Sequence, residues 1–449
     1  MRLPKSLVLA LLLLTAPWAS LPAEEAAGPL RAYVERPDDS YGWVLRRSGE
    51  LGEAKYAELT LTSQTWRDIV WKHQLFVIRP SQVDADGGAL LLIGGGRWKP
   101  ELEGPPGEET ELPREAQLLL SVAEMIRAPV AVLMHVPQQP MFDGMVEDEI
   151  ISYTFEQYFR SGDAEWPLLL PMVKSAVRGM DAVQEFSERE WALDVKWFTL
   201  TGGSKRGWTT WLTSAVDARV TALAPMVIDV LNMRPQMEHQ LATWGTYSEQ
   251  IEDYTRRGLQ QVMVTERGAA LNAIVDPYSY REMLTQPKLI VLGTNDRYWP
   301  LDSLNLYWDG LTGEKHVLYV PNNGHGLKDL ARITGGLAAL HKQAAGRLKL
   351  PEMTWELTEN GDTLDLVVRS DTPPAGVSAW FTSASTKDFR ESVWQSTPAL
   401  EADGAYRYQL KRPTTGYAAL FGEAVFEDGG VPYYLSTNVR ITSAHAAGE

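Results

Sequence analysis

A serine in a glycine-rich turn is the residue of this chain best suited to covalent chemistry. Ser204 follows the apolar run 197–200 and two glycines, and a segment of helical character comes directly after it. Glycines suit such a strand-to-helix turn because its backbone is strained and neighbouring elements pass close to it. A serine held there is exposed beside the N–H groups of the first helical turn, which can stabilise an oxyanion. The segment therefore predicts Ser204 as a nucleophile.

A serine nucleophile needs a base to take its proton and an acid to hold that base. His325 lies in a glycine-rich loop directly after the strand-like run 316–320, and Asp296 follows the buried run 289–292. The order Ser204, Asp296, His325 is that of the α/β-hydrolases, and each residue comes just past the carboxyl end of a strand, where ligands bind in open sheets. His135 remains a reserve base, and Asp302 and Asp229 remain alternative acids.

An oxyanion hole would need two N–H donors near the nucleophile. Lys205 directly follows Ser204 and supplies the first, and Gly95 or Gly96, in the turn after the run 89–93, supplies the second. The turn departs from the usual G-x-S-x-G pattern, because Arg206 occupies the last position and a glycine follows it. We expect Arg206 either to brace the turn through a structural acid or to contact a substrate carboxylate.

A second polar cluster precedes the helical segment 150–159 and consists of Glu147, Asp148 and Glu149. Acids at a helix start complement the helix dipole, which is one explanation of the cluster. The other is that these carboxylates face the cleft and hold an amine or a sugar hydroxyl. His135, after a strand, is expected to line a pocket, and Trp299 beside the predicted acid is expected to form a pocket wall. No metal-binding motif is present, so neither a metal nor another cofactor is predicted.

Strand-like runs that alternate with helical patterns must position these residues. Residues 24–350 contain the strand-like runs 89–93, 130–134, 220–227, 288–292 and 316–320, and the helical segments 115–126, 166–186 and 333–348. This alternation predicts an α/β fold with a mostly parallel sheet and flanking helices. After Pro351 the pattern changes to short alternating runs around an Asn360-Gly361 turn, a strong hairpin signal. Residues 351–449 are therefore predicted to form a small antiparallel, Ig-like β-sandwich.

Composition and charge restrict the class of protein further. The chain has 449 residues, a formal net charge of −16 and no cysteine. We expect no binding to nucleic acid, and disulfides and thiolate catalysis are excluded. Residues 1–23 combine a positive start, the apolar stretch 7–14 and a cleavage site, which predicts a signal peptide. A periplasmic or secreted protein is expected, with no membrane insertion after cleavage of the signal.

The sequence resembles the PhoPQ-activated pathogenicity-related protein family, which includes autocrine proliferation repressor proteins, from about residue 30 to the end. The matching segments are 63–66, 71–75, 92–96, 147–151, 166–174, 203–211, 276–280 and 293–300. The resemblance implies an exported protein of the α/β-hydrolase type with a C-terminal sandwich. The family's links to envelope stress and peptide resistance suggest peptide-like substrates.

These observations favour an exported serine hydrolase that acts on an ester or amide of a small molecule or peptide. Amine capture by residues 147–149 would favour an exopeptidase, whereas Lys205 or Arg206 facing a uronate would favour a carbohydrate esterase. A non-catalytic binding or signalling protein on a hydrolase scaffold is the third possibility. Whether residues 231–285 form a lid is left open by the sequence.

Overall fold

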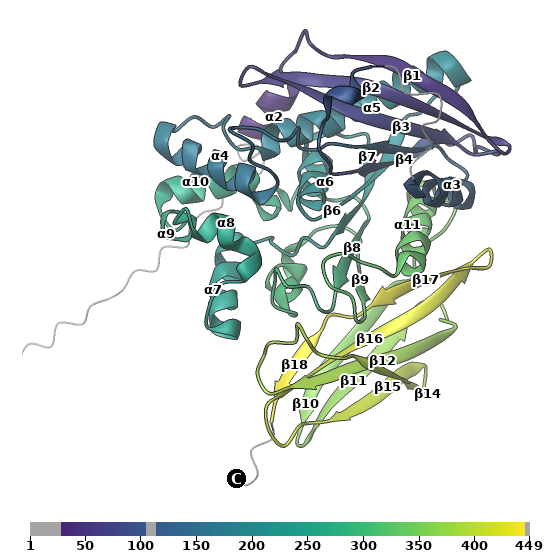
Figure 1. The fold of residues 1–449 in the computed structure, drawn as a ribbon. Coiled ribbons are helices and arrows are strands. Elements are labelled where there is room, and N and C mark those ends of the chain that lie inside the picture. The colour runs from purple at the N-terminus through teal and green to yellow at the C-terminus, as the bar shows by residue number, and fades with distance from the viewer. Residues whose placement is uncertain (1–27, 105–113, 445–449) are drawn as a thin grey trace, which may run out of the picture.

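The computed structural model describes residues 28–104 and 114–444. Its main feature is a large mixed sheet that runs through the whole molecule (Figure 1). The eight strands that matter for the site are, in spatial order, β2 (Ala54–Trp66), β3 (Ile69–Arg79), β5 (Val130–Leu133), β4 (Gly88–Ile93), β6 (Trp197–Gly203), β7 (Val220–Met226), β8 (Lys288–Gly293) and β9 (Lys315–Val320). β5, β4, β6, β7, β8 and β9 are parallel to one another, and β3 is antiparallel to both of its neighbours.

Helices cover the two faces of this sheet. The helices that pack on its strands are α3 (Arg114–Ile126), α5 (Leu169–Trp191), α6 (Lys205–Val216) and α11 (Leu330–Ala344). α2 (Gly28–Glu35) packs on α5, and α4 (Asp148–Ser161) contacts helices of the segment between β7 and β8. β7 and β8 are buried at nearly every position, as expected for strands covered on both faces. The predicted α/β fold is confirmed: the strands from β5 to β9 form a parallel centre with flanking helices, and antiparallel strands extend the sheet on both sides.

The segment 227–287, which joins β7 to β8, forms a group of short helices that we call the cap. Its helices are α7 (Met233–Trp244), α8 (Glu252–Thr255), α9 (Leu259–Val262) and α10 (Glu266–Val275), with single 3-10 turns at Glu249–Ile251 and Pro277–Tyr280. α7 to α10 gather at one side of the molecule, next to α4 (Figure 1). The cap includes residues 231–285, for which the sequence did not decide whether they form a lid.

The C-terminal residues form the predicted antiparallel β-structure. β10 (Met353–Asn360), β11 (Thr363–Ser370), β15 (Ala405–Lys411) and β14 (Leu400–Ala402) make a separate four-stranded sheet. The facing strands are β12 (Gly376–Ala384), β13 (Gln395–Pro398), β16 (Tyr417–Asp428), β17 (Val431–Ser436) and β18 (Arg440–Ser443). These strands continue the main sheet, because β17 pairs with β9. The division of the chain at residue 351 stays a prediction.

The antiparallel meander of β1 (Gly42–Leu51), β2 and β3 was not predicted from the sequence, and it extends the sheet beyond β5.

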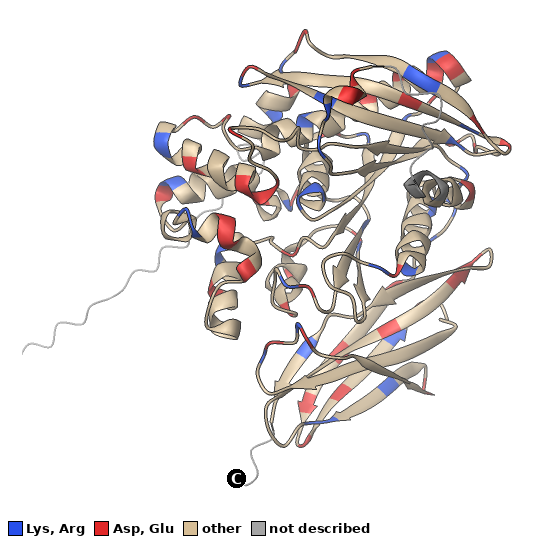
Figure 2. Cartoon of the chain, viewed as in Figure 1, with Lys and Arg blue, Asp and Glu red and all other residues tan. Residues whose placement is uncertain are grey.

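Acidic and basic residues are interspersed over helices and strands (Figure 2). Within the described residues no helix has the length and hydropathy needed to cross a membrane. The predicted signal peptide, residues 1–23, lies outside the described residues.

Candidate active site

Ser204 lies at a sharp turn between β6 and α6. Its backbone has φ 57° and ψ −128°, a conformation that side-chain-bearing residues rarely adopt. Such a conformation costs about 1–3 kcal/mol, and it persists only where the surroundings hold it. Here the Ser204 N–H donates to the carbonyl of Met226 on β7 (2.8 Å), and the Ser204 carbonyl accepts from Trp208 in α6 (3.0 Å). The chain thus presents this serine in the geometry of a nucleophile elbow.

Two glycines allow the close packing of this turn. A Cβ on Gly202 would lie 2.8 Å from the carbonyl oxygen of Arg206, and a Cβ on Gly207 would lie 2.8 Å from the carbonyl oxygen of Gly202. At Gly203 the nearest atom would be 3.9 Å away, so that position has room for a side chain. Gly207 therefore provides the close approach of helix to strand that the usual pattern assigns to a glycine one residue earlier.

His325 and Asp296 are in direct contact. The imidazole Nδ1 lies 2.8 Å from Asp296 Oδ2, and Asp296 Oδ1 accepts a hydrogen bond from the backbone N–H of Tyr298 (2.9 Å). The other imidazole nitrogen, Nε2, is buried and has no hydrogen-bond partner among the described residues. His325 lines the same pocket as Ser204. The structure thus brings Ser204 and His325 to one cavity, and Asp296 lies behind the imidazole of His325.

Tyr298 is a site residue that the sequence reasoning missed. Its ring stacks on the imidazole of His325, with centroids 4.2 Å apart and an interplanar angle of 29°. Trp299 is buried and lines the same pocket. The available signal was the position of Tyr298 two residues after Asp296, where a backbone N–H commonly binds an aspartate side chain.

Four charged residues beside the nucleophile pair with one another. Arg206 donates two hydrogen bonds to Glu147, each 2.8 Å long. Lys205 Nζ lies 2.8 Å from Glu147 Oε2 and 3.2 Å from Asp148 Oδ2. Burial opposes ionisation of Glu147, but the hydrogen bonds and charges of Arg206 and Lys205 hold its pKa well below the ordinary value. We call these residues the ionic quartet. Its internal pairing favours the bracing role among those predicted for Arg206.

The remaining candidates occupy the surroundings of this quartet. The glycine turn after β4 packs beneath Arg206, because a Cβ on Gly95 would lie 2.7 Å from the guanidinium. His135 packs against Gly96 and bonds to Gln74 Oε1 (2.9 Å), and burial lowers its pKa to about 4. Neither His135 nor the glycine turn lines the pocket that holds Ser204.

The other acids weighed for the site are engaged elsewhere. Glu149 lies 3.6 Å from Arg256 at the surface. Asp302 lies 2.7 Å from Nε2 of His239, and Asp229 accepts a 2.7 Å hydrogen bond from the hydroxyl of Tyr307. Within the described residues no group of three or more His, Asp or Glu side chains could hold a metal ion.

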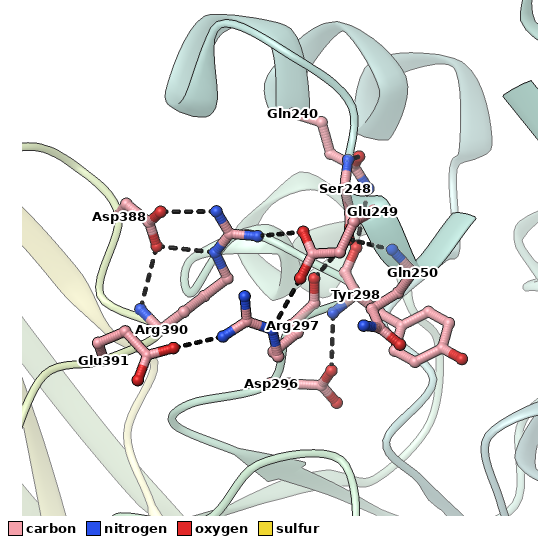
Figure 3. Close-up of polar contacts among 10 residues, drawn as sticks. All are labelled: Gln240, Ser248, Glu249, Gln250, Asp296, Arg297, Tyr298, Asp388, Arg390 and Glu391. Carbon is pink, nitrogen blue, oxygen red and sulfur yellow. Dashed lines mark hydrogen bonds and ion pairs between the residues drawn. The ribbon is translucent and has the colours of Figure 1, made fainter. Parts of the chain in front are cut away.

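A loop of the C-terminal β-structure reaches the site from outside. We call residues 388–394, between β12 and β13, the clamp loop. Asn295, the residue before Asp296, donates from its side chain to the carbonyls of Arg390 (3.2 Å) and Ser392 (2.7 Å). Arg390 also pairs with Glu249 of the cap (2.8 Å), as Figure 3 shows. The clamp loop therefore connects the cap to the loop that carries Asp296.

Arg297 makes a second connection of the same kind. It pairs with Glu249 (2.7 Å) and with Glu391 of the clamp loop, and its carbonyl accepts from the hydroxyl of Ser248 (2.6 Å) (Figure 3). In the loop that carries His325, which we call the base loop, Asn322 exchanges hydrogen bonds with the backbone of Trp394 (2.8 and 3.1 Å). We call the loop that carries Asp296 the acid loop. The clamp loop thus supports the acid loop, the base loop and the cap.

The strand order β2-β3-β5-β4-β6-β7-β8-β9 and the elbow at Ser204 together define an α/β-hydrolase fold. Sequence similarity then identifies the family of this chain within the α/β-hydrolase class. The chain belongs to the PhoPQ-activated pathogenicity-related protein family, whose sequence profile matches residues 30–390. Autocrine proliferation repressor protein A of Dictyostelium discoideum is 31% identical in an alignment 445 residues long, and the alignment covers 91% of this chain and 87% of that protein. The resemblance inferred from the sequence is confirmed.

Solved structures give a weaker likeness. Acetyl xylan esterase 1 from Thermoanaerobacterium sp. has 15% identity and a TM-score of 0.48, and the match covers 71% of this chain and 93% of that one. A glucuronoyl esterase from Solibacter usitatus has 12% identity and a TM-score of 0.44, with 70% and 91% covered. Because both TM-scores are low, the fold assignment here depends on the strand order and on the turn at Ser204.

Proposed function

We propose that this protein is a serine hydrolase that cleaves an ester or amide bond of a small-molecule or peptide-like substrate. The observation that carries the proposal is the contact of His325 with Asp296 beside the pocket that also holds Ser204 on its strained turn. Because Asp296 occupies Nδ1, the imidazole keeps Nε2 for the proton of the Ser204 hydroxyl. The imidazolium that forms is stabilised by the carboxylate behind it.

In this mechanism Ser204 Oγ attacks the scissile carbonyl, and His325 takes the hydroxyl proton and then delivers it to the leaving group. The Lys205 N–H is the first of helix α6 and has no acceptor within that helix, so it is suited to hold the oxyanion. The second N–H, predicted at Gly95 or Gly96, lies outside the pocket, so Lys205 is the oxyanion donor that the pocket itself contains. Water then attacks the acyl-enzyme with His325 as base, the bond between the acyl carbon and Ser204 Oγ breaks, and His325 returns the proton to Ser204 Oγ.

Export to the periplasm or the medium is part of the proposal and depends on the predicted signal peptide, residues 1–23. The pairing within the ionic quartet bears on the two substrate types that the sequence left open. Arg206 and Lys205 are committed to Glu147 and Asp148. The quartet therefore leaves no unpaired cation for a uronate and no unpaired carboxylate for an amine.

Hydrolysis assays on variants test the proposal. The native protein is assayed against p-nitrophenyl esters and aminoacyl-naphthylamides, alongside Ser204→Ala and His325→Ala. We expect both variants to lose at least about a thousandfold in kcat/KM with an unchanged unfolding midpoint, as when a triad member is removed. Native-like activity of folded Ser204→Ala would overturn the proposal, as would a native protein that neither cleaves these substrates nor reacts with a fluorophosphonate. The latter result would favour a binding or signalling protein on this scaffold.

A further inference from the structure

The pocket beside Ser204 is walled mainly by the cap. Ser204, Lys205 and His325 lie on one side of it, together with Trp208 and Tyr298. The apolar residues that the cap contributes are Val227, Ile228, Val230, Met233, Met237, Leu241, Ile251, Leu259, Met263 and Val264. The cavity encloses about 180 Å³. An apolar protein cavity of about 150 Å³ accommodates benzene, so this one has room for an aromatic ring or a short alkyl chain.

The charged side chains that line this pocket are already paired. Asp148 is held by Lys205 (3.2 Å) and by the hydroxyl of Tyr254 (3.1 Å), and Arg234 lies 3.4 Å from Glu238 at the rim. A charged group on a substrate would therefore meet no unpaired opposite charge, and it would lose its hydration on entering. The inner part of the pocket, where Asp148 is already paired with Lys205, is therefore poorly suited to a free carboxylate or ammonium group.

The apolar character of the pocket extends to its mouth. Leu241 is 42% exposed and Val264 is 58% exposed, although both line the cavity. Exposed apolar groups around a cavity mark it as a binding surface for apolar ligands. Three methionines of the cap, Met233, Met237 and Met263, can adjust to ligands of different shape because their side chains are unbranched and flexible.

We infer that the substrate carries an uncharged apolar group, an alkyl chain or an aromatic ring, that this pocket binds while Ser204 attacks the adjacent carbonyl. The inference rests on the proposed function and narrows it. An amide with a hydrophobic side chain and an ester with an apolar acyl or alcohol group share this chemistry. Recognition of an acetyl group, of a uronate or of a free amino terminus does not share this chemistry.

Two substrate series distinguish the possible sources of the apolar group. The first varies the acyl chain of p-nitrophenyl esters from acetate to octanoate, and the second varies the alcohol of acetate esters from ethyl to hexyl and benzyl. We expect kcat/KM to rise at least tenfold along one series, because each buried methylene adds binding energy. Within the responding series, an ester with a terminal ammonium or carboxylate at matched length is expected to react at least tenfold more slowly than its uncharged counterpart.

Matched variants place the effect in the pocket. Val264→Asp and Met237→Glu put a carboxylate into the apolar wall, so the ratio of long-chain to short-chain kcat/KM should fall at least fivefold. Val44 is 67% exposed on the edge strand β1, and Val44→Asp should leave that ratio unchanged.

The outcomes separate the two claims. If the native protein cleaves esters but neither series shows a rise with apolar length, the substrate inference is overturned and the hydrolase proposal stands. If no ester is cleaved, labelling rates with methyl and hexyl fluorophosphonates decide. A faster reaction of the hexyl reagent supports the pocket, whereas equal rates overturn it. Absence of labelling overturns both proposals.

Discussion

At the scale of single residues, the backbone is strained at the starts of α4 and α6. The ion pairs of the ionic quartet join these two helix starts. Ser204 and Glu147 have nearly the same rare conformation, with φ 57° and 55° and ψ −128°. Glu147 is fixed by Gln139, which accepts from its N–H (2.9 Å) and donates to its carboxylate (2.7 Å), and by Arg206 two residues after the nucleophile. The ionic quartet therefore holds the elbow and the start of α4 in one arrangement.

Substitutions of Tyr298 test whether its stacking on His325 fixes the position of that imidazole. Tyr298→Phe keeps the ring on His325 and should retain most of kcat. Tyr298→Ala removes the ring, and we expect kcat to fall about tenfold because a misplaced catalytic group loses effective concentration. Steady-state kinetics measures both, with the unfolding midpoint as the control for folding. Equal kcat values for the two variants would contradict a positioning role.

The elbow glycines give a matched pair of substitutions. Gly207→Ala forces a methyl group against the carbonyls of Gly202 and Met226, at 2.8 and 2.9 Å, whereas the nearest atom to a Cβ on Gly203 would be 3.9 Å away. We expect Gly207→Ala to cost about 1–3 kcal/mol of unfolding free energy through overpacking. The change for Gly203→Ala should stay within about 1 kcal/mol. Urea denaturation measures both, and a reversed order would contradict the packing described for the turn.

Asp229 predicts a pH dependence of stability. Burial, with added repulsion from Asp296 and Asp302, raises the pKa of Asp229 to about 8, although Tyr307 donates a hydrogen bond to it. A carboxyl whose pKa is higher in the folded state stabilises fully below its unfolded pKa of about 4, and this contribution is lost as the pH rises toward 8.

Asp229→Asn keeps the group neutral at every pH. Its stability relative to the native protein should therefore increase between pH 5 and pH 8 by more than about 1.4 kcal/mol, the equivalent of one pKa unit. Urea unfolding at several pH values measures this difference. Parallel profiles for the two proteins would show that Asp229 has no raised pKa.

At the scale of elements, the clamp loop is the part of the molecule that fixes the acid loop against the cap. Arg390 is the centre of this support. Its side chain is only 16% exposed, pairs with Glu249 and Asp388, and covers the ring of Trp244 at 4.3 Å. Arg297 makes comparable ion pairs but is 45% exposed. The two arginines therefore differ in burial rather than in the kind of contact.

We expect Arg390→Ala to lower the unfolding free energy by about 1–3 kcal/mol, because it removes charge-assisted hydrogen bonds and a cation–π contact from a partly buried site. Its kcat should fall as well, since the loop before Asp296 loses its support. Arg297→Ala should cost less than about 1 kcal/mol, as is usual for exposed pairs. Denaturation and kinetics on both variants measure this. A larger loss for Arg297→Ala would contradict the role assigned to the clamp loop.

At the scale of the whole molecule, the α/β part and the C-terminal β-structure share their interior. One apolar cluster contains Leu318 and Val320 of β9 together with Leu366 of β11 and Leu420 of β16. α11 also approaches β17 so closely that a Cβ on Gly335 would lie 2.2 Å from the carbonyl oxygen of Pro432. Independent folding units usually have separate cores and few contacts between them.

We therefore expect the protein to unfold in a single calorimetric transition, and a chain that ends at Leu350 to lack cooperative unfolding. Differential scanning calorimetry of the full chain and circular dichroism of the shortened chain measure these properties. Two separated transitions, or a stable shortened chain, would show that the two parts are energetically independent.

Much of the fold was predictable because buried parallel strands such as β7, β8 and β9 are continuous apolar runs. β2 was missed because polar residues interrupt it on both faces, including the buried Glu58, Ser63 and Gln64. At the site, Ser204 and His325 could be chosen from loop position alone.

The remaining site features depend on contacts between distant parts of the chain. Arg206 and Glu147 are 59 residues apart, and the clamp loop lies almost 100 residues from Asn295. Nothing in the local pattern at either position encodes such a pairing. The apolar pocket was equally hidden, because its wall is assembled from scattered residues of the cap such as Val230, Met237 and Val264.

The account depends on Ser204 being a nucleophile activated by His325, and this can be measured without knowing the substrate. The native protein is treated with a fluorophosphonate and digested, and the modified peptide is located by mass spectrometry. We predict one adduct, on Ser204, that is abolished in His325→Ala with the fold intact. An adduct on a different serine, or an unmodified protein beside a labelled control hydrolase, would contradict the account.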